Sequence, residues 1–289
     1  MTDGLERYVR EWEENAAADP LWVILTDPER YGRKWNQQEF FATGEEEVRR
    51  VLAFMAGVGV PLPRGRFLDF GCGVGRISRA LHPHFENGIG VDISAHMIEL
   101  ARAYVPGIEF AVNQGATLAG IPDAAVDFIW SHIVLQHIPN QFQRGYLAEF
   151  MRVLRPGGLA AFQLPVEIIN PREVRPPRWY RFKQAVKRRM PALLALKRRL
   201  RPATGFHHDF RYEMHALPDR EVREICARGG GRIVAAPATN SCEPEHNGRV
   251  EFFDPAERRR ELVASGQPNR YLSLMYFVRR TGDEGRSGA

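Results

Sequence analysis

The sequence predicts an α/β fold with a doubly wound, mainly parallel sheet. Between residues 66 and 165, short apolar segments alternate with stretches whose apolar residues recur at helical spacing. The first apolar segment ends in a glycine-rich turn, as strands that open onto a ligand site often do. This strand–helix–strand alternation favours parallel strands joined by right-handed crossovers. A chain of 289 residues, 44% of them hydrophobic, is long enough to bury one such core and to carry an added cap.

The elements follow from local patterns. Apolar positions at three- and four-residue steps predict a first helix over 45–58. Strands are expected at 66–70, 88–92, 108–112, 126–131 and 158–164. The helices between them are expected near 75–83, 94–105 and 141–154. The C-terminal part is expected to add a helix at 219–228 and strands at 231–236 and 271–278.

The stretch between the fifth and sixth strands is too long for a plain connection. Trp179, Phe182, Val186 and Met190 recur at helical steps, and Pro191 can begin a second short helix. We therefore expect a helical cap over the carboxyl ends of the strands. The resulting organisation is an N-terminal helical and aromatic segment that closes the site (1–58), a core (59–165), the cap (166–218), a C-terminal completion of the sheet (219–280) and a disordered tail (281–289).

Charge is concentrated in the predicted cap. The net charge is +5, but residues 172–201 hold 12 Lys or Arg and one acid, so the remainder is mildly acidic. Such a segment either binds an anion or is a solvated helix face. No apolar run of 18 residues and no basic-then-apolar leader is present, which predicts a cytoplasmic protein. The three cysteines lack metal-ligand spacing and fit a reducing compartment.

The glycine-rich turn is the most informative motif. Residues 69–75 read Asp-Phe-Gly-Cys-Gly-Val-Gly, which lets the backbone turn sharply and approach a ligand. Arg76 stands where a dinucleotide-binding loop has its last glycine, so the loop favours a nucleoside ligand without a pyrophosphate. Asp92 ends the next apolar segment, about 20 residues on, where a carboxylate can accept hydrogen bonds from both ribose hydroxyls.

With these motifs the chain resembles the class I S-adenosylmethionine (SAM) dependent methyltransferases. The resemblance covers residues 66–165 and includes Asp127 to Ser131 as the fourth strand and Leu154 to Gly158 as the turn before the fifth. It implies a seven-stranded sheet whose last strand is antiparallel, inserted between the fifth and sixth. It also implies SAM as cofactor, with S-adenosylhomocysteine (SAH) as product, bound by Asp69, Gly71, Gly73, Gly75, Arg76, Asp92, Ile93, Met97, Asn113, Gly115 and Ser131. By the same resemblance Asp69 orders the loop, and Met97 and Asn113 could contact adenine. Arg76 could pair with the cofactor carboxylate or form a salt bridge on the helix surface.

The acceptor decides what else the site needs, because an aliphatic hydroxyl must lose its proton as the new bond forms. His137, after the fourth strand, resembles the base of small-molecule and sugar O-methyltransferases of natural-product pathways. Glu167 could orient His137 or bind a substrate hydroxyl. The alternatives are a histidine that packs beside the cofactor and a solvated loop acid.

Five further residues are predicted to contact the acceptor: Trp35, Phe40, His132, His207 and His208. Trp35 or Phe40 could close the pocket and face a cation. His207, His208 and Asp209 form a polar cluster, but no third ligand is spaced to complete a metal site, so we expect no metal.

The sequence thus predicts a SAM-dependent O-methyltransferase for a small or medium polar metabolite, such as a sugar or glycan. The alternatives are an RNA or protein methyltransferase that uses the basic cap, an N-methyltransferase of a small amine, and non-catalytic SAM binding. Nucleic acid is not expected as a partner, since no RNA-binding module is recognisable. Peripheral membrane contact through 178–201 is a further alternative.

Overall fold

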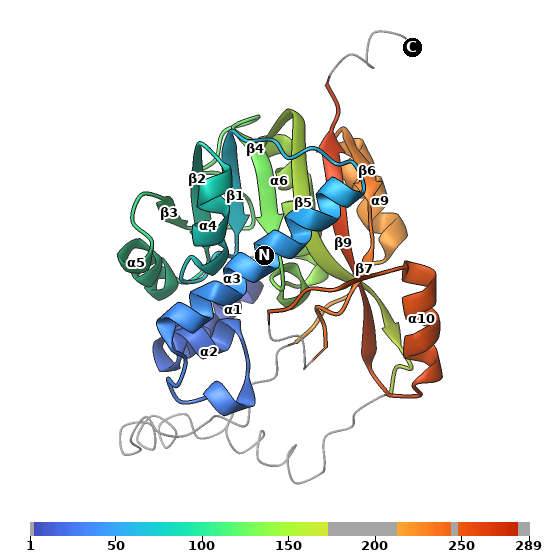
Figure 1. Ribbon diagram of the computed structural model, residues 1–289, viewed down its shortest axis with the longest axis horizontal. Coiled ribbons are helices and arrows are strands. Elements are labelled where there is room, and N and C mark those ends of the chain that lie inside the picture. Colours follow the sequence, from blue (N-terminus) through green and yellow to red (C-terminus); the bar gives the residue numbers. More distant parts are fainter. Residues whose placement is uncertain (1–2, 173–212, 244–247, 283–289) are drawn as a thin grey trace.

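A twisted sheet with helices on both faces forms the body of the protein (Figure 1). The structure is a computed structural model that describes residues 3–172, 213–243 and 248–282. The strands lie in the order β3-β2-β1-β4-β5-β9-β7-β8, with β6 also paired to β9. Their bounds are β1 Arg66–Phe70, β2 Asn87–Asp92, β3 Glu109–Val112, β4 Val126–Ser131, β5 Leu154–Ile169, β6 Gly231–Ala235, β7 Ala238–Thr239, β8 Phe252–Phe253 and β9 Arg270–Arg280.

The topology confirms the predicted fold class. Strands β1 to β5 run parallel, and β9 pairs antiparallel with β5 on one side and with β6 on the other. β9 is the predicted last strand, inserted between the fifth and sixth. The carboxyl ends of β1, β2 and β4 therefore meet at one edge of the sheet, where open α/β sheets bind ligands.

Apolar side chains alternate between the two faces of the sheet and hold a helical layer on each. On one face, α3 (Gln37–Gly57) and α4 (Arg76–Leu81) bury a cluster that includes Phe67, Phe128 and Trp130. On the other face, α6 (Asn140–Val153) and α9 (Asp219–Arg228) bury Phe150, Phe162 and Tyr276 among others.

The remaining helices lie around this core. Helix α5 (Ala95–Tyr104) follows β2, and α10 (Pro255–Ala264) packs near β9. The N-terminal part forms α1 (Asp3–Ala18), α2 (Pro20–Ile24) and the short turn η1 (Pro28–Arg30). Two further short turns are η2 (His82–His84) and η3 (Leu135–His137). In Figure 1, α1 and α2 lie at the end of the sheet to which the parallel strands point.

Two predicted boundaries are wrong. The first long helix begins at Gln37 rather than 45, because the Asn36 side chain accepts hydrogen bonds from the backbone of Gln38 and Glu39. Strand β5 spans Leu154–Ile169 rather than 158–164, because Leu154 pairs with Val126 of β4 and residues 159–169 pair with β9, so residues 166–169 belong to the sheet and not to a cap. Most of the predicted cap, including 178–201, lies outside the described residues.

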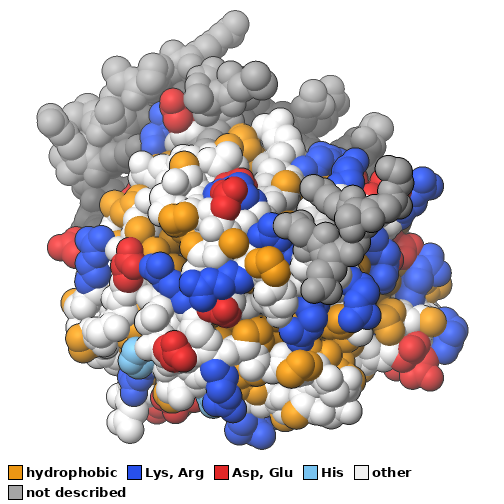
Figure 2. All heavy atoms as spheres, turned by 90° about the horizontal axis from the view of Figure 1, so that it is seen from above, with side chains coloured by type: hydrophobic (Ala, Val, Ile, Leu, Met, Phe, Trp, Pro, Cys, Tyr) orange, Lys and Arg blue, Asp and Glu red, His pale blue; other side chains and the backbone are white. Residues whose placement is uncertain are grey.

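Figure 2 views the molecule from above and shows acidic and basic side chains interspersed with apolar ones. Within the ranges that the structure describes, no helix is long and apolar enough to cross a membrane.

Candidate functional site

The glycine loop between β1 and α4 adopts a backbone that glycine alone accepts easily. Gly71, Gly73 and Gly75 have φ values of +78°, +53° and +83°. A Cβ on Gly71 would lie 2.4 Å from Val134, and one on Gly73 would lie 2.6 Å from Ile24 of α2. The loop thus turns sharply, as predicted, and its glycines leave room for Val134, just before η3, and for Ile24 of α2.

Asp92 ties this loop to the next strand and helix. One carboxylate oxygen accepts the Gly73 N–H at 2.9 Å, and the other accepts the Ser94 N–H at 2.9 Å. Burial raises the pKa of Asp92 above its usual value. Each oxygen keeps a second lone pair, so Asp92 can still accept two hydroxyl hydrogen bonds.

Asp69 lies beneath the loop rather than in it. Its side chain is 2% exposed and accepts a hydrogen bond from the Ser78 hydroxyl at 2.6 Å. Burial raises the pKa of Asp69 to about 7, and the nearby charge of Asp92 adds to the shift. Asp69 therefore supports the loop from below, in line with its predicted ordering role.

The predicted adenine side of the site gathers around the ends of β2 and β3. The Asn113 N–H donates to the Asp92 carbonyl at 2.8 Å, which holds the two strand ends together. The Tyr146 hydroxyl donates to the Gly115 carbonyl and also bonds the Asn113 side chain. Met97 is 3% exposed and packs in the cluster that holds Cys72 of the loop, and Ile93 lies between it and Asp92.

Helix α1 spans this edge of the sheet. The Glu13 carboxylate accepts hydrogen bonds from Ser94 Oγ at 2.9 Å and from the Ala95 N–H at 2.5 Å, and so caps α5. The Trp12 ring meets the His137 ring edge-on at 5.9 Å between centroids. On the same side, Tyr8 donates to Glu213 at 3.2 Å. The helix therefore connects the Asp92 side of the edge with the His137 side.

His137 lies in η3, next to Gln136 and the segment that begins at residue 213. Its Nε2 is 3.0 Å from Gln136 Nε2, and its Nδ1 is 3.4 Å from the Glu213 carbonyl. Burial, together with a smaller contribution from His215, lowers the pKa of His137 from 6.5 to about 4. The ring is therefore neutral at physiological pH.

Several predicted site residues are held elsewhere. The prediction that Arg76 binds the cofactor carboxylate is not supported, because Arg76 is buried and pairs with Glu47 of α3 at 2.8 Å. His132 is not placed for an acceptor either: its ring contacts Glu47 at 2.6 Å and Ser241 at 2.7 Å, and its side chain is 1% exposed. The helix α3 packs on α4 and supplies Glu47 to both residues.

Glu167, predicted to assist His137, uses both oxygens to accept hydrogen bonds from Arg259 of α10. That ion pair lowers the pKa of Glu167. Phe40 is fully buried and contacts Trp35 edge-on, so it belongs to the core rather than to a pocket wall. The Trp35 indole N–H donates to the Leu25 carbonyl at 3.2 Å. His207 and His208 lie outside the described residues.

A group of buried polar residues lies behind the site and was not predicted from the sequence. Gln136, Gln163, Ser241 and Ser273 are at most 4% exposed; Gln163 bonds Gln136 and Ser273, and Ser241 joins Ser273 through Thr239. The sequence contains one sign of this group. Gln163 interrupts the apolar run of a central strand, and a polar side chain buried there needs hydrogen-bond partners. Ser131 is also fully buried, and its hydroxyl has no partner among the described atoms.

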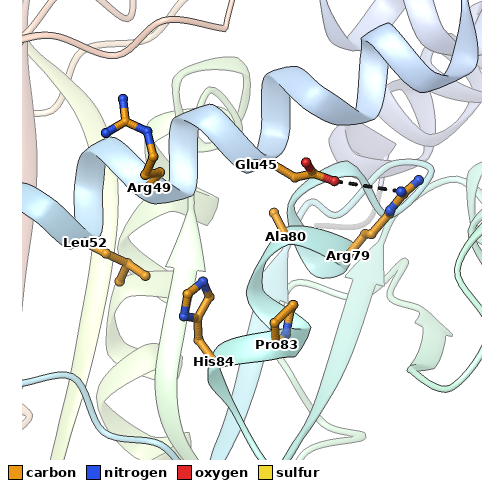
Figure 3. A pocket seen from close by; sticks show the side chains of 7 residues that line it. All are labelled: Glu45, Arg49, Leu52, Arg79, Ala80, Pro83 and His84. Carbon is orange, nitrogen blue, oxygen red and sulfur yellow. Dashed lines mark ion pairs between the residues drawn. The ribbon is translucent and has the colours of Figure 1, made fainter.

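A separate surface hollow of about 550 Å³ lies between α3 and the α4–η2 segment (Figure 3). In Figure 3, Glu45 and Arg79 face each other across its rim, and His84 points toward it. Its lining residues are Glu45, Arg49, Leu52, Arg79, Ala80, Pro83 and His84. It includes none of the residues predicted to bind the cofactor.

Comparisons with known proteins agree with this geometry. Residues 68–162 match a family model described as a methyltransferase domain. Two curated relatives are trans-aconitate 2-methyltransferases: one from Methylobacterium radiotolerans is 32% identical over 139 residues, and one from Azoarcus sp. is 34% identical over 134 residues. These matches cover 47% and 45% of this chain and 52% and 51% of the relatives, so the chain spans about half the length of the curated relatives it matches.

A solved structure from Galdieria sulphuraria, provisionally named a sarcosine dimethylglycine methyltransferase, shares the fold. Its TM-score is 0.50 at 16% identity, over 85% of this chain and 88% of that chain. The family match spans the glycine loop and Asp92 and agrees with SAM as the cofactor. Which residues bind SAM stays a prediction.

Proposed function

We propose that this chain, whose residues 68–162 form a class I SAM-dependent methyltransferase domain, methylates a carboxylate oxygen of a small polycarboxylic acid. Bound SAM supplies a methyl group activated by its sulfonium. The curated relatives are named for trans-aconitate. That acid carries three carboxylates and no hydroxyl, so an oxygen acceptor in it is a carboxylate oxygen.

The observation that carries the proposal is the contact at His137 Nε2, which the Gln136 amide nitrogen occupies at 3.0 Å. His132 and Glu167, the other sequence-predicted polar candidates, are held by Glu47 with Ser241 and by Arg259. A carboxylate is already ionised at neutral pH, so it needs none of these groups to remove a proton.

Charge supports an anionic acceptor as well. Residues 172–201 contain 12 Lys or Arg and a single acid. A segment of this composition raises the local concentration of a polyanion and can neutralise its carboxylates. The role of this segment in holding the acceptor rests on its composition alone.

The hydroxyl acceptor predicted from the sequence, a sugar or glycan with His137 as base, is the second candidate. A neutral imidazole at the end of β4 favours it, because only the neutral ring can accept a proton. For this reaction the hydrogen bond from the Gln136 amide to His137 Nε2 would have to break, so that this nitrogen could accept the hydroxyl proton.

A labelled-methyl assay separates the two candidates. The purified chain is incubated with methyl-labelled SAM and, separately, with trans-aconitate, other di- and tricarboxylic acids, sugars and secondary alcohols. We expect the acids to take label at least 100-fold faster than the hydroxyl compounds, and Asp92→Ala to abolish transfer to all of them. Faster transfer to sugars, or to added RNA or protein, would contradict the proposal.

A further inference from the structure

A series of hydrogen bonds leads from Ile133, after β4, through Gln163 of β5 to His137, and the direction of each bond can be assigned. It begins at the Ile133 N–H, which lies 3.0 Å from Gln163 Oε1. A backbone N–H can only donate, so this contact identifies the oxygen of the Gln163 amide. The other end of that side chain is therefore the nitrogen, a donor.

The next contact fixes the second amide. Gln163 Nε2 lies 3.1 Å from Gln136 Oε1 and 2.6 Å from Ser273 Oγ. The Cys242 thiol also reaches Gln136 Oε1, at 3.3 Å. Burial raises the pKa of that thiol to about 12, so it keeps its proton and donates. Two donors at one atom mark it as the amide oxygen, and the Gln136 nitrogen must face the other way.

The Gln136 nitrogen faces His137 Nε2, at 3.0 Å. An amide nitrogen donates and does not accept, so His137 Nε2 must carry its lone pair here. The ring proton is then on Nδ1, which donates to the Glu213 carbonyl at 3.4 Å. We propose that Gln163 and Gln136 are positioning residues that lock His137 in the Nδ1–H tautomer.

The surroundings of this relay resist rearrangement. Gln163 is fully buried and Gln136 is 4% exposed, so neither amide can exchange its protein partners for bulk water. Ile133, which starts the relay, has a φ of +59°, a costly conformation for a β-branched residue. Strain of this kind persists only where the surrounding contacts enforce it.

This inference has a consequence that rests on the proposed function. In the Nδ1–H tautomer, His137 carries no positive charge that would face a cationic methyl donor. A proton on Nε2 would face the N–H of Gln136, which disfavours the imidazolium. The other groups that act on the ring are His215, which lowers its pKa, the Glu213 carbonyl, which raises it, and the Trp12 ring edge from α1.

NMR of the protein with ¹⁵N-labelled histidine tests the assignment on the whole chain. The His137 signals are identified by their loss in His137→Asn. We expect wild-type His137 to be protonated at Nδ1, unprotonated at Nε2 and unchanged between pH 5.5 and 8. An Nε2–H tautomer, or an even mixture of the two, would overturn the proposal without any variant.

Gln136→Glu is the informative variant, because it keeps an oxygen for Gln163 and places a carboxylate oxygen at His137 Nε2. We expect Nε2 to become protonated and the acid dissociation constant of His137 to fall at least 100-fold. Gln141→Glu is the matched control, since Gln141 is exposed in the first turn of α6. An equal response in both variants would contradict the positioning role.

The same variant separates this inference from the proposed function. With Gln136→Glu we expect kcat to fall about tenfold while the Kd for SAM changes less than twofold. An unchanged kcat with an altered tautomer would refute a positioning role. If the acceptor proves not to be a carboxylate, the wild-type tautomer measurement still decides the inference by itself.

Discussion

Two carboxylates next to the glycine loop, the buried Asp69 and the partly buried Asp92, differ in what they contact. Asp92 accepts hydrogen bonds from the backbone at both oxygens and keeps lone pairs toward the site. Asp69 accepts from Ser78 inside the protein and is 2% exposed. The first is placed to bind a ligand, and the second to support the loop, so substitutions at the two should have different effects.

Asp92→Ala should weaken SAM and SAH binding by at least about 100-fold. The variant loses two hydrogen bonds from a charged acceptor to ribose, each worth roughly 1.5–3 kcal/mol, and it also releases Gly73. Isothermal titration calorimetry measures the change. Glu99→Ala is the control, because Glu99 lies in the neighbouring α5 with an 84% exposed side chain. Equal affinity in Asp92→Ala and the wild type would remove Asp92 from the site.

The difference in unfolding free energy between Asp69→Asn and the wild type should shift in favour of the variant between pH 5 and pH 8. The pKa of Asp69 is about 7 in the fold and 3.8 as the ordinary value, so the folded state binds the proton more tightly. Its contribution to stability is present below about pH 4 and is lost as the pH rises through 7. Between pH 5 and 8 the wild type should lose about 2 kcal/mol more than Asp69→Asn.

Urea unfolding at the two pH values measures this difference. Asp123→Asn serves as the surface control, since the Asp123 side chain is 79% exposed and pairs with Arg152. A free-energy difference between Asp69→Asn and the wild type that is the same at pH 5 and pH 8 would show that Asp69 titrates normally.

Among single residues, the sequence identifies those whose roles follow from the local backbone conformation. The three loop glycines and Asp92 could be predicted because a glycine-rich turn after a strand restricts both conformation and position. The partners of Arg76 and His132 could not, because Glu47 reaches both from a helix about 30 and 85 residues earlier in the chain. No local pattern encodes such a contact.

Among the elements, α1 has the most direct bearing on access to the site. It caps α5 through Glu13 and meets η3 through Trp12. The predicted closing role of residues 1–58 stays a proposal, and these two anchors give it a testable form. If α1 covers the cofactor, loosening its Glu13 anchor should speed cofactor exchange.

Glu13→Gln removes the charge that complements the N-terminus of α5, an interaction worth about 1 kcal/mol. Backbone amides of α1 should then exchange with deuterium about fivefold faster, and SAH should dissociate faster to a similar degree. Hydrogen-exchange mass spectrometry and stopped-flow release measure the two rates. Glu6→Gln, at an exposed position in the same helix, is the control. Unchanged SAH release with faster exchange would show that α1 is not a cover.

Helices and strands could be predicted where their burial produces a clear pattern of apolar residues in the sequence. β1 and β4 lie at the predicted residues, since their apolar runs are short and bounded by turns. The full length of β5 could not be predicted, because its last residues are strand only through their pairing with β9, more than 100 residues away. The bounds of α1 and α2 within the predicted N-terminal helical segment could not be predicted, because aromatic and charged residues obscure the periodicity there, and α10 was not predicted.

For the molecule as a whole, the parallel sheet brings the loop after β1, Asp92 after β2 and η3 after β4 to a single edge. One side of this edge carries Asp92 and the other residues predicted to bind SAM, and the other side carries His137 with its hydrogen bonds to Gln136 and Gln163. A basic stretch of sequence, 172–201, follows β5 directly. Together these features favour an anionic acceptor that needs no proton removal.

The most direct test of carboxylate methylation is to identify the type of bond that joins the transferred methyl group to the product. The labelled product is treated with mild alkali, and volatile labelled methanol is measured, because methyl esters hydrolyse under these conditions and methyl ethers and methylamines do not. We expect nearly all of the label to be released as methanol. Label that stays in the product would show an ether or an amine, and would contradict carboxylate methylation.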